Sequence, residues 1–303
     1  MKDDEKFVKE TYVYRTVPRG KLQADVYRVR DGTPQPVVMW IHGGALIFGH
    51  REGIAPHEVA MFLGAGYTVV SIDYRLAPEA KLRGIIEDVQ DAYRWVRTSG
   101  PELFGADADR VAVMGGSAGG YLTLLAGACF EPRPSALVSV AGYCDITGPW
   151  YSSPDAFYRQ QPIVPKQKAY EAVGGQEAAW NETQGSERWS FYLYCRQQGL
   201  WPREVAGYDP HTEPEAFDPY CPVRNITADY PPTLLVHGDK DTDVPYEQSA
   251  LMAQSLARAG VEHEFISIAG GGHCSMGLDE AFVAKTYARI LAFLDRHLSP
   301  RQR

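Results

Sequence analysis

One serine, one histidine and a small group of aspartates stand at positions that suit nucleophilic catalysis. Ser117 lies in the pattern Gly-x-Ser-x-Gly, which follows the apolar run Val111–Met114 and precedes a helix-forming stretch. A sharp turn between a strand and a helix exposes a serine hydroxyl, and Gly115 and Gly119 permit the close backbone approach that this turn needs. The context therefore predicts a nucleophile elbow at Ser117, with the amide of Ala118 directed at charge that develops beside the serine.

A serine hydroxyl is a poor nucleophile at neutral pH, so it needs a base within hydrogen-bond reach and a carboxylate that orients the base. His273 follows three glycines after the last apolar strand-like segment, which makes it the predicted general base. Asp239, Asp241 and Asp243 crowd the turn after the preceding such segment. We favour Asp241 as the carboxylate and expect the other two to be turn residues or helix caps.

A negatively charged transition state also needs backbone donors. Gly43, Gly44 and Ala45 follow a continuous apolar run, and together with Ala118 they are the predicted oxyanion hole, because their amides lie on unobstructed backbone. His42 is expected to brace this loop by hydrogen bonds and not to touch substrate.

Short apolar runs alternate with segments of helical spacing along most of the chain. We expect an antiparallel hairpin within 11–30, then strands over 36–41, 66–72, 111–114, 136–141, 232–237 and 261–268, with helices between them. This alternation predicts an α/β fold with a mostly parallel central sheet flanked by helices. The loops that carry Ser117, Asp241 and His273 all follow strands, so they are expected to meet at one edge of that sheet.

The alternation lapses between residues 143 and 230, which we interpret as a lid inserted after the sixth core strand. The core is then predicted to comprise residues 1–142 and 231–303. The insertion is rich in aromatic residues: Trp150, Tyr151, Phe157, Tyr158, Trp180, Trp189, Phe191, Tyr192, Tyr194 and Trp201. Most of these rings are expected to form the lid's own small core, and a few to face the substrate.

Composition excludes several other classes of function. The net charge of -8 disfavours binding to nucleic acid or to an anionic membrane surface. The charged amino terminus lacks a signal-peptide core and no segment is long and apolar enough to span a bilayer, so a cytoplasmic protein is expected. The five cysteines include no C-x-x-C pair, which predicts reduced thiols and neither a metal nor a cofactor. Cys274 is expected to be a small buried residue and not a second nucleophile.

Several motifs together resemble the α/β hydrolases, and within them the esterases related to hormone-sensitive lipase. They are His42-Gly43-Gly44, the segment Asp73-Tyr74-Arg75-Leu76-Ala77-Pro78-Glu79, Gly116-Ser117-Ala118-Gly119-Gly120 and the turn His237-Gly238-x-x-Asp241. The resemblance covers residues 36–142 and 231–298. It implies an α/β-hydrolase fold and hydrolysis of small carboxylic esters through an acyl-enzyme, and it selects Asp241 by its position in the motif.

The chain departs from that group in three respects. Ala45 replaces the third glycine of the oxyanion motif, Gly116 stands where an aspartate is usual, and too little chain precedes the first strands to build an amino-terminal cap. The cap is therefore expected from the insertion, which makes the chain more similar to small carboxylesterases of feruloyl-esterase or formamidase type. Short acyl or aromatic groups are the predicted substrates, in preference to long-chain lipid.

Two alternatives stay open from the sequence. An amidase, formamidase or peptidase would use the same three residues. A non-catalytic binding protein on a hydrolase scaffold would close its lid over a small ligand, although the intact set of Ser117, Asp241 and His273 argues against it. A homodimer is also compatible with the sequence.

Overall fold

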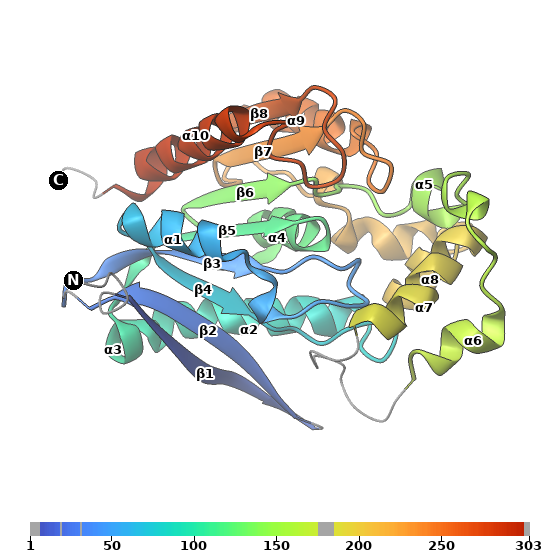
Figure 1. The fold of residues 1–303 in the computed structure, drawn as a ribbon, viewed down its shortest axis with the longest axis horizontal. Helices are drawn as coiled ribbons and strands as arrows, with labels where there is room; N and C mark the ends of the chain where they lie inside the picture. Colours follow the sequence, from blue (N-terminus) through green and yellow to red (C-terminus); the bar gives the residue numbers. More distant parts are fainter. Residues whose placement is uncertain (1–6, 19, 31, 175–184, 300–303) are drawn as a thin grey trace.

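The computed structural model describes residues 7–18, 20–30, 32–174 and 185–299. Within these residues eight strands form one twisted sheet in the order β1-β2-β4-β3-β5-β6-β7-β8 (Figure 1). Their bounds are β1 Phe7–Val17, β2 Gly20–Val29, β3 Gln35–Ile41, β4 Thr68–Ile72, β5 Ala106–Gly116, β6 Ala136–Val140, β7 Thr233–Gly238 and β8 His263–Ile268. The β1–β2 hairpin is antiparallel and β2 also pairs antiparallel with β4, whereas every pair from β4 to β8 is parallel. The predicted mostly parallel sheet is confirmed.

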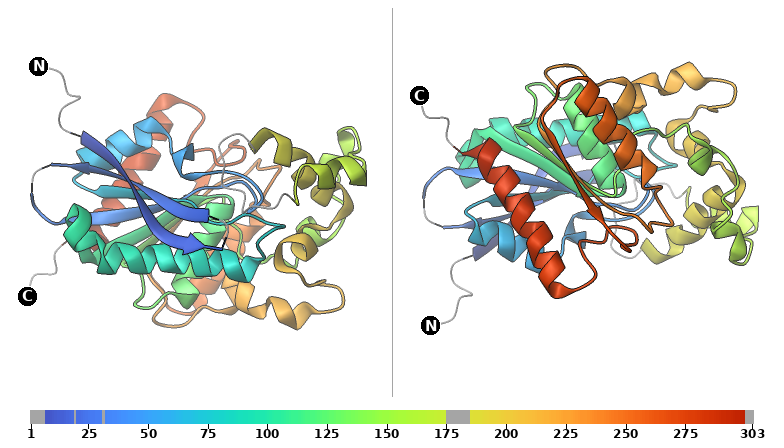
Figure 2. Two further views of the ribbon diagram at one scale, coloured as in Figure 1. Left: turned by 90° about the horizontal axis from the view of Figure 1, so that it is seen from below. Right: turned by 90° about the horizontal axis from the view of Figure 1, so that it is seen from above.

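The parallel strands are apolar on both faces because helices cover both faces. Along β3, Met39 and Ile41 pack in the core under α2, α4 and α9, while Val38 and Trp40 pack on the opposite side with α1 and α10. Figure 2 shows α2 and α10 on opposite sides of the sheet. The helices span α1 Pro56–Gly64, α2 Leu82–Thr98, α3 Gly100–Phe104, α4 Ala118–Cys129, α9 Glu247–Arg258 and α10 Glu280–Leu298, with a 3₁₀ turn at Arg51–Gly53.

Residues 143–230, which we call the helical insertion, lie between β6 and β7. Their described part contains α5 Pro149–Ser152, α6 Lys166–Glu171, α7 Gly185–Gln198 and α8 Trp201–Ala206, with 3₁₀ turns at Tyr158–Gln160, Pro214–Tyr220 and Pro222–Arg224. In Figure 1 these helices stand beyond the carboxyl ends of the parallel strands, where the loops that follow β3, β5, β7 and β8 also lie. The insertion therefore borders the edge at which the sequence predicts the site.

Among the described residues, none of the helices combines the length and apolar character that crossing a membrane would require.

Candidate active site

Ser117 occupies a strained turn between β5 and α4. Its φ of 56° and ψ of -120° place a non-glycine residue in a region that side chains disfavour, and such strain is typical of functional sites. The glycines around it are required by contact, since a Cβ on Gly119 would overlap the carbonyl oxygen of Ile41 and a Cβ on Gly115 would lie 2.5 Å from the carbonyl carbon of Gly119. This close approach seats α4 against β3 and leaves the Ser117 side chain on the wall of a cavity.

His273 and Asp241 are joined across the loops that follow β8 and β7. The ring Nδ1 of His273 donates to Asp241 Oδ2 over 2.7 Å, and the other carboxylate oxygen, Oδ1, accepts the backbone amides of Asp243 and Val244 at 2.8 and 2.9 Å. The Asp241 side chain has no exposed surface. Burial alone would raise its pKa, but hydrogen bonds from His237 and His273 hold the pKa of Asp241 well below its ordinary value, so the carboxylate stays ionised.

His237 is a residue of this site that the sequence analysis did not assign. Its Nε2 donates to Asp241 Oδ2 and to the carbonyl oxygen of Val244, each over 3.1 Å, while Nδ1 accepts from Ser249 Oγ at 2.7 Å. The ring is buried at the end of β7 and therefore fixes the Asp241 carboxylate from behind. The motif His237-Gly238-x-x-Asp241 was the available signal, because it places a ring donor four residues before the acid.

The two alternative aspartates of the same turn have separate partners. Asp239 Oδ1 accepts the backbone amide of Gly270 over 2.7 Å and so joins the turns after β7 and β8, as expected for a turn residue. Asp243 instead lines the cavity, and its Oδ2 lies 3.4 Å from Nε2 of His273. The structure thus gives the imidazole a carboxylate on each of its two nitrogens.

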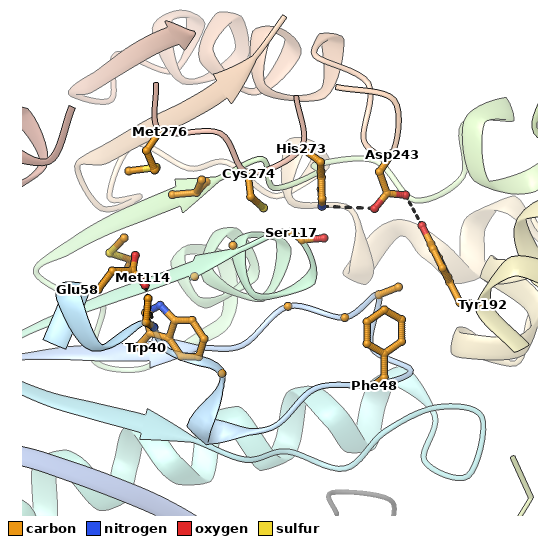
Figure 3. A pocket seen from close by; sticks show the side chains of 18 of the residues that line it. Trp40, Phe48, Glu58, Met114, Ser117, Tyr192, Asp243, His273, Cys274 and Met276 are labelled. Atoms are coloured by element: carbon orange, nitrogen blue, oxygen red, sulfur yellow. Dashed lines mark hydrogen bonds and ion pairs between the residues drawn. The ribbon is translucent and has the colours of Figure 1, made fainter. Parts of the chain in front are cut away.

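Ser117 and His273 border the same cavity, but the structure contains no hydrogen bond between these two described side chains. The Nε2 of His273, which a general base would turn toward the serine, faces Asp243. In Figure 3 the Ser117 side chain lies beside the line that joins His273 to Asp243. Apo sites often have catalytic hydrogen bonds that form only with substrate present. Hence the predicted Ser117–His273 hydrogen bond requires the ring to turn away from Asp243.

Gly43, Gly44 and Ala45 line the cavity next to the serine. A Cβ at Gly43 would lie 3.4 Å from the Ser117 Cβ, which shows how closely the loop approaches the nucleophile. Gly44 has φ 103° and Ala45 has φ 54°, so the chain turns sharply here and the Gly44 carbonyl accepts the amides of Ile47 and Phe48. Ala118 is the first residue of α4, where an amide has no partner within the helix. All four predicted oxyanion donors therefore come from segments beside Ser117.

His42 braces this loop from below. Its ring is buried, stacks on Tyr74 with centroids 4.0 Å apart, and has Nδ1 2.7 Å from the Gly43 carbonyl oxygen, to which it donates. The Tyr74 hydroxyl donates to the His42 carbonyl over 2.9 Å. Because the ring is buried, the pKa of His42 is lowered to about 3, so the ring is neutral at physiological pH.

The cavity has a volume of about 800 Å³ and extends to both sides of the serine. Toward the helical insertion it is lined by Phe48, Tyr158, Trp189 and Tyr192, and in the other direction it passes Trp40, Met114 and Met276 to reach Glu58 and Tyr287 between α1 and α10 (Figure 3). Both arms are mainly apolar, which suits the acyl and alcohol portions of an ester.

Within the described residues the aromatic side chains of the insertion do not form a separate lid core, contrary to the prediction. Tyr151, Phe191 and Trp201 are buried in the same cluster as Ala45 and Tyr121 of the α/β core, and the Tyr151 ring stacks on Trp201 with centroids 4.1 Å apart. Only a few of the ten rings line the cavity: Tyr158, Trp189 and Tyr192. Trp180 lies outside the described residues.

The prediction that Cys274 is buried was wrong, whereas its expected lack of a nucleophilic role stays a prediction. This residue is only half-buried and lines the cavity beside His273, because a φ of 55° turns the chain so that its side chain lies over Gly116. Among the described residues there is no group of three or more His, Cys, Asp and Glu side chains arranged to hold a metal ion.

Comparison with known proteins identifies the family. Residues 38–277 match a family model described as the alpha/beta hydrolase fold. Esterase LipC of Mycobacterium tuberculosis is 29% identical over 90% of this chain, which spans 61% of LipC. The non-reducing polyketide synthase adrD of Penicillium rubens is 30% identical over 82% of the chain, which spans only 12% of that synthase.

Solved structures agree with this fold. A bacterial heroin esterase superimposes with a TM-score of 0.71 at 21% identity, covering 98% of this chain and 86% of its own. An esterase of Pyrobaculum calidifontis gives a TM-score of 0.67 at 24% identity, covering 97% of this chain and 86% of its own. As its motifs predicted, the chain belongs to the family of proteins with the α/β-hydrolase fold.

Proposed function

We propose that this protein is a carboxylesterase-type serine hydrolase that cleaves small esters with short acyl or aromatic groups. The observation that carries the proposal is the convergence on one cavity wall of a strained serine, a carboxylate-bound histidine and the glycine loop. The similarity to the esterase LipC supports the same type of reaction. The helical insertion is proposed to act as the lid of the core formed by residues 1–142 and 231–303.

In the proposed mechanism Ser117 Oγ attacks the ester carbonyl carbon while His273 Nε2 takes the hydroxyl proton. The imidazolium that forms is stabilised by Asp241 through the Nδ1 hydrogen bond. The carbonyl oxygen becomes negative, and amides of Gly43, Gly44, Ala45 and Ala118 are the proposed donors to it. His273 then gives the proton to the leaving alcohol oxygen.

Deacylation repeats these steps with water as the nucleophile. Water loses a proton to His273 Nε2 and attacks the acyl carbon, and the proton then returns to Ser117 Oγ as the acid leaves. Both halves of the reaction use the same three side chains and need no cofactor.

Labelling with an organophosphonate tests the nucleophile. We expect the parent protein to be labelled at Ser117 and the Ser117→Ala variant to lose both labelling and ester hydrolysis. A parent that is not labelled and does not hydrolyse esters would instead support a binding protein on a hydrolase scaffold.

The substrate class is tested with p-nitrophenyl esters of increasing acyl length beside feruloyl esters and aryl formamides. We expect acetate, butyrate or aromatic acyl groups to give the highest kcat/KM. Faster cleavage of palmitate would contradict the acyl preference, and faster cleavage of formamides would assign the protein to the amidases. A cytoplasmic location and a homodimer stay predictions from the sequence.

A further inference from the structure

A second carboxylate faces the catalytic nitrogen of His273. Asp241 Oδ2 lies 2.7 Å from Nδ1 of the ring, and Asp243 Oδ2 lies 3.4 Å from Nε2. Nε2 is the atom that must exchange a proton with Ser117 and with the leaving group in the proposed mechanism. Asp243 therefore competes with Ser117 for the one ring nitrogen that takes part in proton transfer.

The helical insertion fixes Asp243 in this orientation. Its Oδ1 accepts the Tyr158 hydroxyl and the Arg196 guanidinium, at 2.8 and 2.7 Å, and also the Tyr192 hydroxyl. Arg196 is buried on α7, and its second terminal nitrogen pairs with Asp155 Oδ2 at 2.7 Å. Three donors thus occupy Oδ1 and leave Oδ2 directed at His273, as Figure 3 shows for the Tyr192–Asp243–His273 line.

We propose that Asp243 is a positioning residue that binds the Nε2–H of protonated His273, so that the resting enzyme holds an imidazolium between two carboxylates until the ring loses that proton to solvent water and turns to Ser117. The proposal rests on the function proposed above. Asp243 accepts a hydrogen bond and takes no proton. When Ser117 Oγ transfers its proton to Nε2, the new N–H again has Asp243 within reach until the proton passes to the leaving oxygen.

Other groups face the ring, and they stay constant when Asp243 alone is changed. Asp241 lies behind it and Cys274 beside it, and Arg196 on α7 binds Asp243 on the side away from the ring. The far arm of the cavity brings His57 and Glu58 from α1 and the Tyr287 hydroxyl from α10, which donates to Glu58 over 3.0 Å.

Burial of the His273 ring disfavours its charge, but the hydrogen bond to Asp241, the neighbouring Cys274 and the Asp243 charge together raise the pKa of His273 well above its ordinary value. The neutral, active form of the ring therefore gains population as pH rises. We accordingly expect kcat/KM to increase toward alkaline pH.

The variant Asp243→Asn tests the proposal through the pH profile. Loss of the carboxylate opposite Nε2 lowers the pKa of His273, so the acid limb of kcat/KM is expected to move to lower pH by about one unit. Because the imidazolium formed in the transition state also loses a partner, kcat on the alkaline plateau is expected to fall about threefold. KM should change little.

Asp155→Asn is the matched control. Asp155 Oδ2 binds the same guanidinium, while its Oδ1 accepts the amides of Phe157 and Tyr158, contacts that an asparagine retains. Asp155 does not face His273, so this variant should leave the acid limb in place. Asp243→Glu, which keeps the charge, should restore the limb toward its parental position.

If Asp243→Asn does not fold, the Tyr192→Phe variant can test the same proposal through the pH profile of kcat/KM. It removes one donor from Asp243 and leaves the carboxylate less compensated, so the acid limb should move to higher pH. The inference is overturned if the acid limb of kcat/KM does not move in Asp243→Asn, or if it moves equally in Asp155→Asn. Labelling of Ser117 would still support the proposed esterase in either case. Retained activity in Ser117→Ala would instead reject the proposed function itself.

Discussion

Replacement of His42 should change how the stability of the fold depends on pH. The ring is buried and neutral, stacked on Tyr74, and its pKa is lowered to about 3 because burial disfavours the charged form. In the unfolded chain the same imidazole takes up a proton near pH 6.5. We choose His42→Asn because an asparagine amide can still donate to the Gly43 carbonyl but cannot be protonated.

The sign and size of the effect follow from linkage. Between the folded and unfolded pKa values the unfolded state binds more protons, so stability is fully present above pH 6.5 and is lost as pH falls toward 3. A pH of about 5 is roughly 1.5 units below the pKa of the unfolded ring. This difference corresponds to a loss of about 2 kcal/mol in the free energy of unfolding relative to about pH 8.

Urea unfolding of the parent and His42→Asn at these two pH values measures the difference. Other titrating groups contribute equally to both proteins, so they cancel when the two pH-dependent losses are subtracted. We expect the parent to lose about 2 kcal/mol more than the variant on acidification. Equal losses in the two proteins would show that the folded ring titrates normally, and would refute the assignment of His42 as a buried neutral brace.

Two further predictions concern the loop and its support. Arg188→Ala should lower the unfolding free energy by about 3–5 kcal/mol, because it leaves Glu79 mostly buried without its cation. The exposed pair Arg83–Glu87 is the control, since Arg83→Ala should cost less than about 1 kcal/mol in the same urea titration, and similar losses in the two variants would contradict the structure. Gly44→Ala should lower kcat about a hundred-fold or more, because its Cβ would overlap the Phe48 carbonyl oxygen and displace an oxyanion donor. Gly53 lines the same cavity, and a Cβ on it would lie 3.8 Å from the Trp40 side chain. Gly53→Ala should therefore keep the parental kcat. Equal kcat values in the two variants would exclude Gly44 from the oxyanion hole.

The sheet and the elbow could be predicted from the sequence because both depend on local patterns. Short apolar runs bounded by glycine and proline located β3 and β7 within one or two residues of their bounds. The elbow was recognisable because its glycines stand within two residues of Ser117 in the motif, although the backbone that requires Gly119 is that of Ile41 in β3. The loops that follow β5 and β8 bring Ser117 and His273 to one cavity, and the loop after β7 brings Asp241 to His273.

The direction of each side chain within the acidic turn could not be predicted from the sequence. Asp239, Asp241 and Asp243 are spaced by two residues and have the same chemistry, and only the folded turn assigns one to Gly270 and two to His273. Asp243 depends on partners more than forty residues away in the chain, such as Arg196. Tyr192 and Arg196 lie one turn apart on α7, but nothing in the local sequence of that helix indicates that they meet the turn after β7.

One helix of the insertion supports both halves of the candidate site. On α7, Arg188 donates to the carbonyl oxygens of Ile47 and Ala77 behind the glycine loop, and Arg196 binds Asp243 in the acidic turn. The two arginines are eight residues apart, which separates them by about 12 Å along the helix axis. Loops that follow β3 and β7 are thus held by one rigid element that belongs to neither. We therefore propose that the helical insertion helps to set the distance between the glycine loop and the acidic turn, so that a change in the packing of α7 would alter both.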